Sequence, residues 1–274
     1  MIHAGSQIRS PWHVMRSSIY ALIIRNLEMR FIMKSSDKRL FDLFLIFIEP
    51  AGHILIWTAV RSFRNQQIED GISPALFMLL GVMPWLFTYN TINECLGIIV
   101  GNRGLLFFKQ IKPLDPIIAQ GCSEFTTMAL VFCCALAVFS LFNIHWQIHN
   151  SLRWFVAIVL YFIFVTGLGI IIACISFFSK PLAKLLRVFL RVMYLFSGIF
   201  FSAQMVSADT RQYFIINPLF QLIEISRGCF SSSSSYDRFG DLYYLFECAI
   251  VSIVLGLGLY TVLRKKMMTE IMEH

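Results

Sequence analysis

The chain has 274 residues, of which 57% are hydrophobic, 15% are aromatic and only 14% are charged, with a formal net charge of +7. A soluble domain has about 25% charged residues, so this composition excludes an ordinary soluble protein and indicates a membrane protein. The excess of Lys and Arg favours contact with anionic lipid over nucleic-acid binding, because no basic patch lies on a soluble domain.

The first forty residues are too charged for a signal peptide. Their pattern of apolar and polar residues predicts an amphipathic helix instead. On a helical wheel, one apolar stripe is formed by Tyr20, Ile23, Ile24, Leu27 and Phe31. Such a helix lies in the cytoplasmic membrane interface, and we expect Arg25 on its opposite side, toward water. It is interpreted either as a simple basic anchor or as a gate or docking element, and the residues of that element are Arg16, Arg25, Arg30 and Phe31.

Six apolar runs follow, each about 20 residues or longer, which is the length a helix needs to cross the hydrocarbon core. They lack the alternation of strands, so the predicted fold is an all-α membrane protein with six transmembrane helices. The runs cover residues 41–60, 75–100, 117–142, 154–178, 185–201 and 242–263. If both termini are cytoplasmic, most of the 23 Lys and Arg residues lie on the inner side, which is the expected orientation.

Within the first run, Glu49 and His53 lie four residues apart beside Pro50, so they share one helical face. Ionisable groups in a membrane span are costly, and we expect this pair to face protein or a polar pathway. Aromatic rings stack on sugar rings, which suits a path for a glycan. The candidate pathway residues are Glu49, His53, Trp57, Trp85 and Tyr89.

The segment 101–116 carries basic, aromatic and proline residues between two apolar runs. Residues 103–110 are long enough for two helical turns, and Pro113 and Pro116 prevent a continuous helix into the third run. A short helix with apolar contacts and basic flanks predicts a knob for a partner's groove, and a solvated basic loop is the alternative. The candidate coupling residues are Arg103, Leu105, Leu106, Phe108 and Lys109.

Residues 202–241 form the longest segment on the outer side. Its stretch "INPLFQLIEISRG" predicts a short helix with Asn217 as cap, Pro218 in the first position and Gly228 just past the end. Glu224 and Arg227 can pair because they are three residues apart on this helix. The candidate residues of this gate are Asn217, Pro218, Gln221, Glu224 and Arg227.

The sequence predicts no catalytic or metal-ligating residues and no nucleotide site. His145 and His149 are four residues apart, but two ligands without a third are weak evidence for a metal. The Walker A pattern of nucleotide-binding loops is absent, so any ATP must be bound by another chain.

Six segments, read in order, resemble the membrane subunit of type-2 ATP-binding-cassette exporters, and within it the Gram-negative capsular polysaccharide export permeases. The segments are "IYALIIRNLEMRF", "EPAGHILIW", "GVMPWLFTYNTINE", "GNRGLLFFKQIKPLDPIIAQ", "SGIFFS" and "NPLFQLIEISRG". The resemblance covers nearly the whole chain. It departs from the family at Gln221, where His is usual, and at "AQMVSAD", where a Pro usually follows "SGIFFS".

This resemblance implies that residues 1–274 form a single transmembrane domain of the bacterial inner membrane. It implies a homodimer with two separate ATPase subunits, which would bind ATP and Mg and would contact the N-terminal helix and segment 101–116. The substrate would be a lipid-linked acidic polysaccharide, handed to a periplasmic co-polymerase and an outer-membrane channel. The helices of segment 202–241 would re-enter the outer leaflet and close the exit.

Three alternatives stay open at this point. The same permease class also moves O-antigen or teichoic-acid glycans. An integral membrane enzyme could modify glycolipids with Glu49 and His53 as acid and base, although a catalytic site needs more convergent polar groups than this one pair. A structural membrane subunit without a pathway is the third.

Overall fold

The computed structural model describes residues 11–31, 39–63, 72–108, 110–232 and 239–273, with only the backbone described at residues 11, 39–46, 57 and 61–63. This part of the chain is all-helical, as predicted. Its elements are α1 (Pro11–Phe31), α2 (Arg39–Phe63), α3 (Pro74–Cys95), α4 (Ile98–Gly101), α5 (Arg103–Leu106), α6 (Leu114–Leu141), α7 (Ser151–Phe178), α8 (Lys180–Met193), the 3₁₀ turn η1 (Ala203–Met205), α9 (Ala208–Ile215), α10 (Pro218–Phe230) and α11 (Leu242–Glu273).

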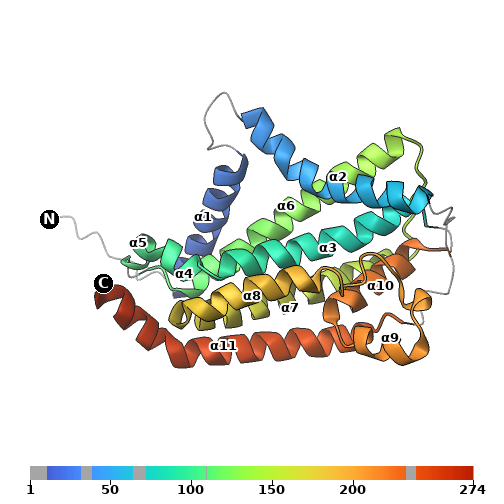
Figure 1. The fold of residues 1–274 in the computed structure, drawn as a ribbon. Helices are drawn as coiled ribbons and strands as arrows, with labels where there is room; N and C mark the ends of the chain where they lie inside the picture. Colours follow the sequence, from blue (N-terminus) through green and yellow to red (C-terminus); the bar gives the residue numbers. More distant parts are fainter. Residues whose placement is uncertain (1–10, 32–38, 64–71, 109, 233–238, 274) are drawn as a thin grey trace.

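The long helices form an elongated bundle in which the axes of α3, α7, α8 and α11 are roughly aligned (Figure 1). The start of α1 and the end of α11 lie at one end of this bundle, together with α4 and α5. The helices α9 and α10 lie at the opposite end. We call these the α5 end and the α10 end.

Four of the described helices are long and apolar enough to cross a membrane. They are α3, α6, α7 and α11, and they correspond to four of the predicted runs. Two boundaries differ by five residues or more: α3 ends at Cys95 rather than at residue 100, and α11 continues to Glu273 rather than ending at residue 263. The first predicted run lies in α2, whose apolar part covers Phe47–Val60.

The fifth predicted run is not one continuous helix. Its first half lies in α8, which ends at Met193, and residues 194–201 form turns. Gly198 in these turns has a φ of 76°, a backbone conformation that residues with a Cβ rarely adopt. The expectation of a helix through residue 201 is therefore wrong in its second half.

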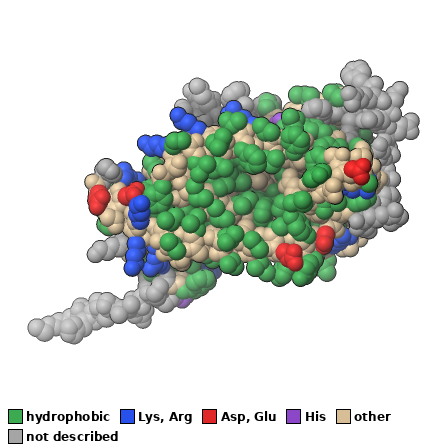
Figure 2. Space-filling view, turned by 60° about the horizontal axis from the view of Figure 1, so that its bottom comes forward, with side chains coloured by type: hydrophobic (Ala, Val, Ile, Leu, Met, Phe, Trp, Pro, Cys, Tyr) green, Lys and Arg blue, Asp and Glu red, His purple; other side chains and the backbone are tan. Residues whose placement is uncertain are grey.

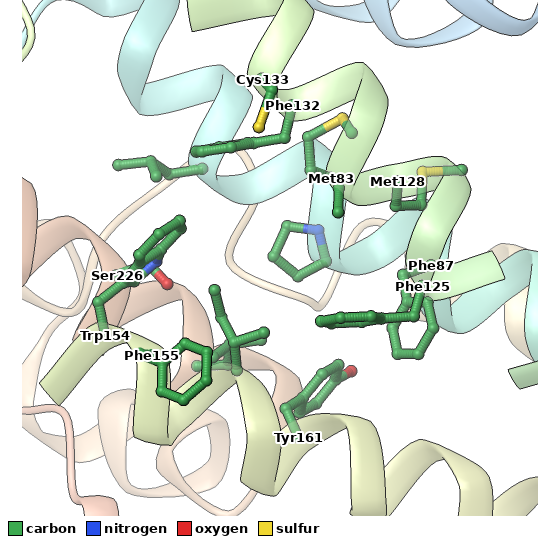
Figure 3. Close-up of a pocket in the computed structure, with 15 residues that line it drawn as sticks. Met83, Phe87, Phe125, Met128, Phe132, Cys133, Trp154, Phe155, Tyr161 and Ser226 are labelled. Atoms are coloured by element: carbon green, nitrogen blue, oxygen red, sulfur yellow. The ribbon is translucent and has the colours of Figure 1, made fainter. Parts of the chain in front are cut away.

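Hydrophobic side chains cover the broad middle of the face shown in Figure 2, and charged side chains gather toward its two ends. This distribution matches a chain whose middle lies in hydrocarbon and whose ends lie in water or among headgroups. Beside α3, the flanking helices α6 and α7 leave an apolar cavity of about 260 Å³ (Figure 3).

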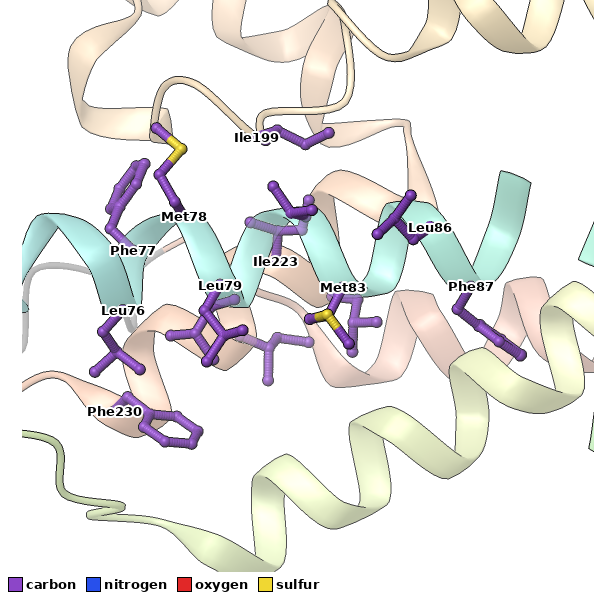
Figure 4. Packing of buried hydrophobic residues seen from close by; sticks show 14 of the residues in the cluster. Leu76, Phe77, Met78, Leu79, Met83, Leu86, Phe87, Ile199, Ile223 and Phe230 are labelled. Carbon is purple, nitrogen blue, oxygen red and sulfur yellow. The ribbon is translucent and has the colours of Figure 1, made fainter. Parts of the chain in front are cut away.

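The core is built around α3, which is apolar on nearly every side and is therefore buried on nearly every side. Its side chains Leu79 and Leu86 have no exposed surface. In Figure 4 they lie in one cluster with Ile199 from the turns after α8 and with Ile223 and Phe230 from α10. The α10 end is thus joined to the core through α3.

The helices α7 and α11 approach closely through small residues. A Cβ atom added to Gly167 would lie 2.6 Å from the backbone carbonyl carbon of Ser252. One added to Gly256 would lie 2.8 Å from the carbonyl oxygen of Gly167. Small residues at such crossings let two backbones pack together, which is how helices associate where lipid offers no hydrophobic driving force.

Candidate functional site

At the α10 end, α10 begins where the sequence predicts. The side-chain oxygen of Asn217 accepts a hydrogen bond from the backbone nitrogen of Leu219 at 3.0 Å, and Pro218 is the first helical residue. The predicted end is wrong, because the helix passes Gly228 and continues to Phe230. Tertiary packing overrides the poor helix propensity of Gly here, since nearly the whole of α10 is buried.

The predicted pair of Glu224 and Arg227 is confirmed. An Nη1 to Oε1 distance of 3.3 Å joins them, and both side chains are fully buried. Desolvation raises the pKa of the Glu224 carboxyl, and the charge of Arg227 opposes that rise.

Arg227 also holds the turns that follow α8. Its guanidinium donates hydrogen bonds to three backbone carbonyls at 2.9 Å each, those of Gly198, Ile199 and Phe201. It lies over the ring of Phe77 on α3, with its central carbon 3.4 Å from the ring centroid. A buried charge is tolerated only when its donors find acceptors, and this arrangement supplies them from three parts of the chain.

Two glycines make room for this arrangement. A Cβ atom on Gly81 would lie 3.2 Å from Nη2 of Arg227, and one on Gly198 would lie 2.3 Å from the ring of Phe220. Gly198 lies in "SGIFFS", a segment that the sequence resemblance singled out without assigning this role. The sequence therefore indicated that this segment matters, but it did not reveal that Gly198 packs against Phe220.

Gln221 connects the neighbours of α10. Its amide nitrogen donates to the backbone oxygen of Ile215 at 2.8 Å, and its side-chain oxygen accepts from the backbone nitrogen of Asp241 at 2.8 Å. It therefore ties the end of α9 to the start of α11. These bonds make Gln221 part of the framework of this end of the bundle.

At the α5 end, the predicted coupling segment contains less helix than expected, and its helix α5 is only four residues long. The helix α5 ends at Leu106 instead of continuing to residue 110, and Pro113 directly precedes α6. Leu106 is only 2% exposed, whereas the next two residues, Phe107 and Phe108, are 60% and 63% exposed. The expectation of Leu106 as an exposed docking contact is therefore wrong, and Phe107 is an exposed residue that the sequence reading missed.

The other candidate coupling residues have mixed surroundings. Leu105 is half-buried, and Lys109 lies outside the described residues. Arg103 donates from Nη2 to the backbone oxygen of Glu270 at 3.1 Å, which joins this segment to the end of α11.

The helix α1 turns its polar side toward α6 and the α5 end. Arg25 donates from Nη2 to the side-chain oxygen of Asn102 at 2.8 Å, and the amide of Asn26 donates to Gln120 at 3.3 Å. Partial burial lowers the pKa of Arg25. The expectation that Arg25 faces water is therefore wrong, because loop and helix residues provide its acceptors.

A buried carboxylate explains this orientation of α1. Glu124 on α6 is fully buried and forms a two-pronged ion pair with Arg30, in which the Nη1 to Oε2 distance is 2.9 Å. Gln120 donates to the same carboxylate at 3.0 Å. Of the remaining candidates on α1, Arg16 is exposed and Phe31 is half-buried.

Three of the candidate pathway residues meet in one cluster. His53 Nδ1 lies 2.8 Å from the hydroxyl of Tyr194, whose ring packs against the edge of Trp85 at 4.5 Å between centroids. Trp85 in turn stacks on Tyr89 at 4.8 Å. Tyr194, just past α8, is the central member, and the sequence reading missed it because it lies far from the others along the chain.

The other two pathway candidates are not brought into this cluster. Glu49 is exposed on α2, and the side chain of Trp57 lies outside the described residues. Within the described part of the chain, no group of three or more His, Cys, Asp or Glu side chains is placed to hold a metal ion. The cluster of His53, Tyr194, Trp85 and Tyr89 offers ring faces and hydroxyl or imidazole edges, which suits contact with sugars more than acid–base chemistry.

The amino-acid sequence of the chain is similar to those of several known membrane proteins. The chain is 27% identical over 267 residues to the polysialic acid transport protein KpsM of Escherichia coli, which covers 96% of this chain and 99% of the relative. It is 25% identical over 241 residues to the capsule polysaccharide export inner-membrane protein CtrC of Neisseria meningitidis, with 86% and 89% covered. It is 22% identical over 242 residues to BexB of Haemophilus influenzae, with 88% of each chain covered.

No family model matches the chain. The curated homologues are nevertheless capsule polysaccharide export inner-membrane proteins, and this confirms the resemblance found in the sequence.

Proposed function

We propose that this chain is the transmembrane subunit of an ATP-driven exporter that moves lipid-linked capsular polysaccharide from the cytoplasm across the bacterial inner membrane. The observation that carries the proposal is the end-to-end similarity to capsule polysaccharide export inner-membrane proteins. The four long apolar helices supply the membrane-spanning framework that such a subunit needs.

The complete exporter in this proposal contains two copies of the chain and two ATPase subunits, which bind the ATP and Mg. The exposed rings of Phe107 and Phe108 support this arrangement, because exposed aromatic pairs beside basic residues are typical of a contact that a partner covers. A periplasmic co-polymerase and an outer-membrane channel would receive the acidic polysaccharide, and membrane lipids would surround the bundle.

In this proposal the chain crosses the membrane six times, with both termini in the cytoplasm. The helix α2 and the segment that begins with α8 would add two crossings to the four apolar helices. The helices α9 and α10 would re-enter the outer leaflet and close the exit. The position of α4 and α5 beside the start of α1 and the end of α11 supports a common cytoplasmic side (Figure 1).

The aromatic cluster around Tyr194 is proposed to line the glycan path. It joins α2, α3 and the turns after α8, and its members are only partly buried, so ring surface stays available. Stacking of sugar rings on such faces tolerates a sliding polymer, because every ring presents a similar apolar face.

The coupling part of the proposal is tested with Phe108→Asp in the assembled exporter. The charge would be buried without a partner in the ATPase contact, so we expect a loss of about tenfold or more in co-purified ATPase and in surface glycan. The matched control is Phe142→Asp, since Phe142 is 74% exposed just past α6 at the other end. Normal co-purification and normal surface glycan in Phe108→Asp would contradict the proposal.

The substrate class needs a separate test. Deletion of the gene for this chain should trap lipid-linked capsular glycan inside the cell, and the accumulated glycolipid can be identified by mass spectrometry. Accumulation of O-antigen or teichoic-acid precursors instead would assign the permease to a different glycan.

A further inference from the structure

A cavity lies between α6 and α7, and its lining residues belong neither to the coupling segment nor to the aromatic cluster around Tyr194. Its volume is about 260 Å³, and its walls also include residues of α3 and α10. In Figure 3, the labelled side chains surround an open centre, with Met83 on one side and Phe155 and Tyr161 on another. The space is larger than the roughly 150 Å³ engineered cavity that binds benzene.

The lining offers almost no polar group to a ligand. Its side chains contribute nearly only carbon and sulfur, apart from the hydroxyls of Tyr161 and Ser226 and the indole nitrogen of Trp154. The hydroxyl of Tyr161 already pairs with the hydroxyl of Thr88 at 2.6 Å. Water needs two to four polar partners to occupy a cavity, so water does not fill this one.

The mouth of the cavity opens onto the exposed side of two helices that are long and apolar enough to cross a membrane. Ala129 and Cys133 of α6 and Phe155 of α7 line the cavity and are exposed. Their neighbours Leu130 and Val159 are also exposed and apolar. Both helices are long and apolar enough to cross the bilayer, so an opening on their exposed apolar side is suited to hydrocarbon.

The cavity is elongated along the helices. Its lining runs from Phe125 to Cys133 on α6, which at 1.5 Å per residue is about 12 Å. Phe125 packs against Phe87 and Phe162 with ring centroids 6.0 and 5.2 Å apart, and these rings lie at one end of the lining. A cavity that extends along the spanning helices also extends along the direction of lipid chains beside them.

We propose that this cavity binds one hydrocarbon chain of a membrane lipid. An empty cavity of this size would leave its walls without dispersion partners, and the only solvent at the mouth is lipid. The occupant touches Leu222 and Ser226 of α10, the helix that carries Arg227, so a bound chain also supports the α10 end. The chain comes either from a bilayer phospholipid or from the lipid anchor of a glycan.

The experiment uses the full chain in vesicles of phosphatidylethanolamine and phosphatidylglycerol that contain a phosphatidylglycerol with a diazirine at the end of one acyl chain. Met83 is the diagnostic residue, because it lines the cavity but is only 5% exposed. After illumination, we expect labelling of Met83 and Met128 to exceed labelling of Val254, a 61% exposed residue on α11, by about tenfold. Labelling of Met83 no stronger than that of Val254 would overturn the proposal.

A matched pair of variants tests the mouth. Ala129→Trp places a large ring in the opening and should reduce labelling of Met83 about tenfold, whereas Leu130→Trp adds the same ring to a side chain outside the cavity and should not. Unchanged labelling in Ala129→Trp would overturn the proposal. If this variant does not fold, Cys133→Phe blocks the same mouth, and the labelling pattern of the wild-type chain decides independently.

Competition identifies the source of the chain. Unlabelled phospholipid and purified lipid-linked glycan are each added at equal mole fraction. Displacement by both equally supports a bilayer lipid, and stronger displacement by the glycolipid supports its anchor. Displacement by neither would contradict reversible occupancy by a hydrocarbon chain and overturn the proposal.

Discussion

The two ends of the bundle are built in opposite ways. At the α10 end, a helix that the sequence predicts as an interface is almost wholly buried, and Arg227 joins it to α3 and to the turns after α8. At the α5 end, Leu106 is buried while Phe107 and Phe108 are exposed. The helix α10 therefore completes its packing within the chain, whereas the short segment at the α5 end leaves the rings of Phe107 and Phe108 exposed beside a buried Leu106.

The largest expected effect comes from Arg227→Ala at the α10 end. The change removes the donors to three backbone carbonyls and leaves Glu224 buried without its partner, so we expect a loss of about 3–5 kcal/mol in the free energy of unfolding. Thermal unfolding in detergent measures it. Arg211→Ala is the control, because Arg211 lies in the same segment and is only partly buried.

A thermal midpoint for Arg227→Ala equal to that of Arg211→Ala would show that the α10 end does not depend on this buried guanidinium. A strong loss of stability would instead mean that any export defect of the variant reflects the fold as well as a gate.

At the α5 end, the comparison predicts opposite results for two residues that lie two positions apart. Leu106→Ala removes a buried side chain and should cost about 2–5 kcal/mol of unfolding free energy. Phe108→Ala removes an exposed side chain and should change it by less than about 0.5 kcal/mol. The two purified variants can be compared by thermal unfolding, and equal losses would show that Leu106 does not belong to the core.

These residues also show where prediction from the sequence succeeds. Apolar length and the Asn217–Pro218 cap are local properties, so four spans and the start of α10 are predicted close to their observed places. Pairing of Glu224 with Arg227 follows from helical spacing alone.

The failures have a common physical origin. The burial of Leu106, the orientation of Arg25 toward Asn102 and the position of Tyr194 beside His53 all depend on helices distant in sequence. The break after α8 depends on Gly198 fitting against Phe220, a contact that no periodicity reveals. Local sequence patterns predict where helices lie. Tertiary packing decides which face of each helix is buried.

Glycine substitutions sharpen the contrast between the two ends. Gly198→Ala forces a Cβ into a positive-φ position and against the Phe220 ring, and should cost about 1–3 kcal/mol. Gly104→Ala lies in α5, where an added Cβ meets nothing within 4 Å, and should leave stability unchanged or slightly raised. Thermal unfolding of both variants checks this, and equal midpoints would mean that the turns after α8 relax freely.

The smallest expected effect on stability comes from Arg25→Ala, which tests how the α5 end is held. Arg25 is partly exposed, so loss of its hydrogen bond to Asn102 should cost only about 0.5–1 kcal/mol. The loss is local, because Asn102 directly precedes α5. Hydrogen–deuterium exchange should therefore become faster around residues 98–108 and stay unchanged in α10, which packs mainly against α3, α7 and α11. The control is Arg16→Ala, which changes an exposed arginine on the same helix. If exchange in both ends responded equally to Arg25→Ala, the two ends would be one cooperative unit, and the contrast between the buried α10 and the partly exposed segment at the α5 end would not hold.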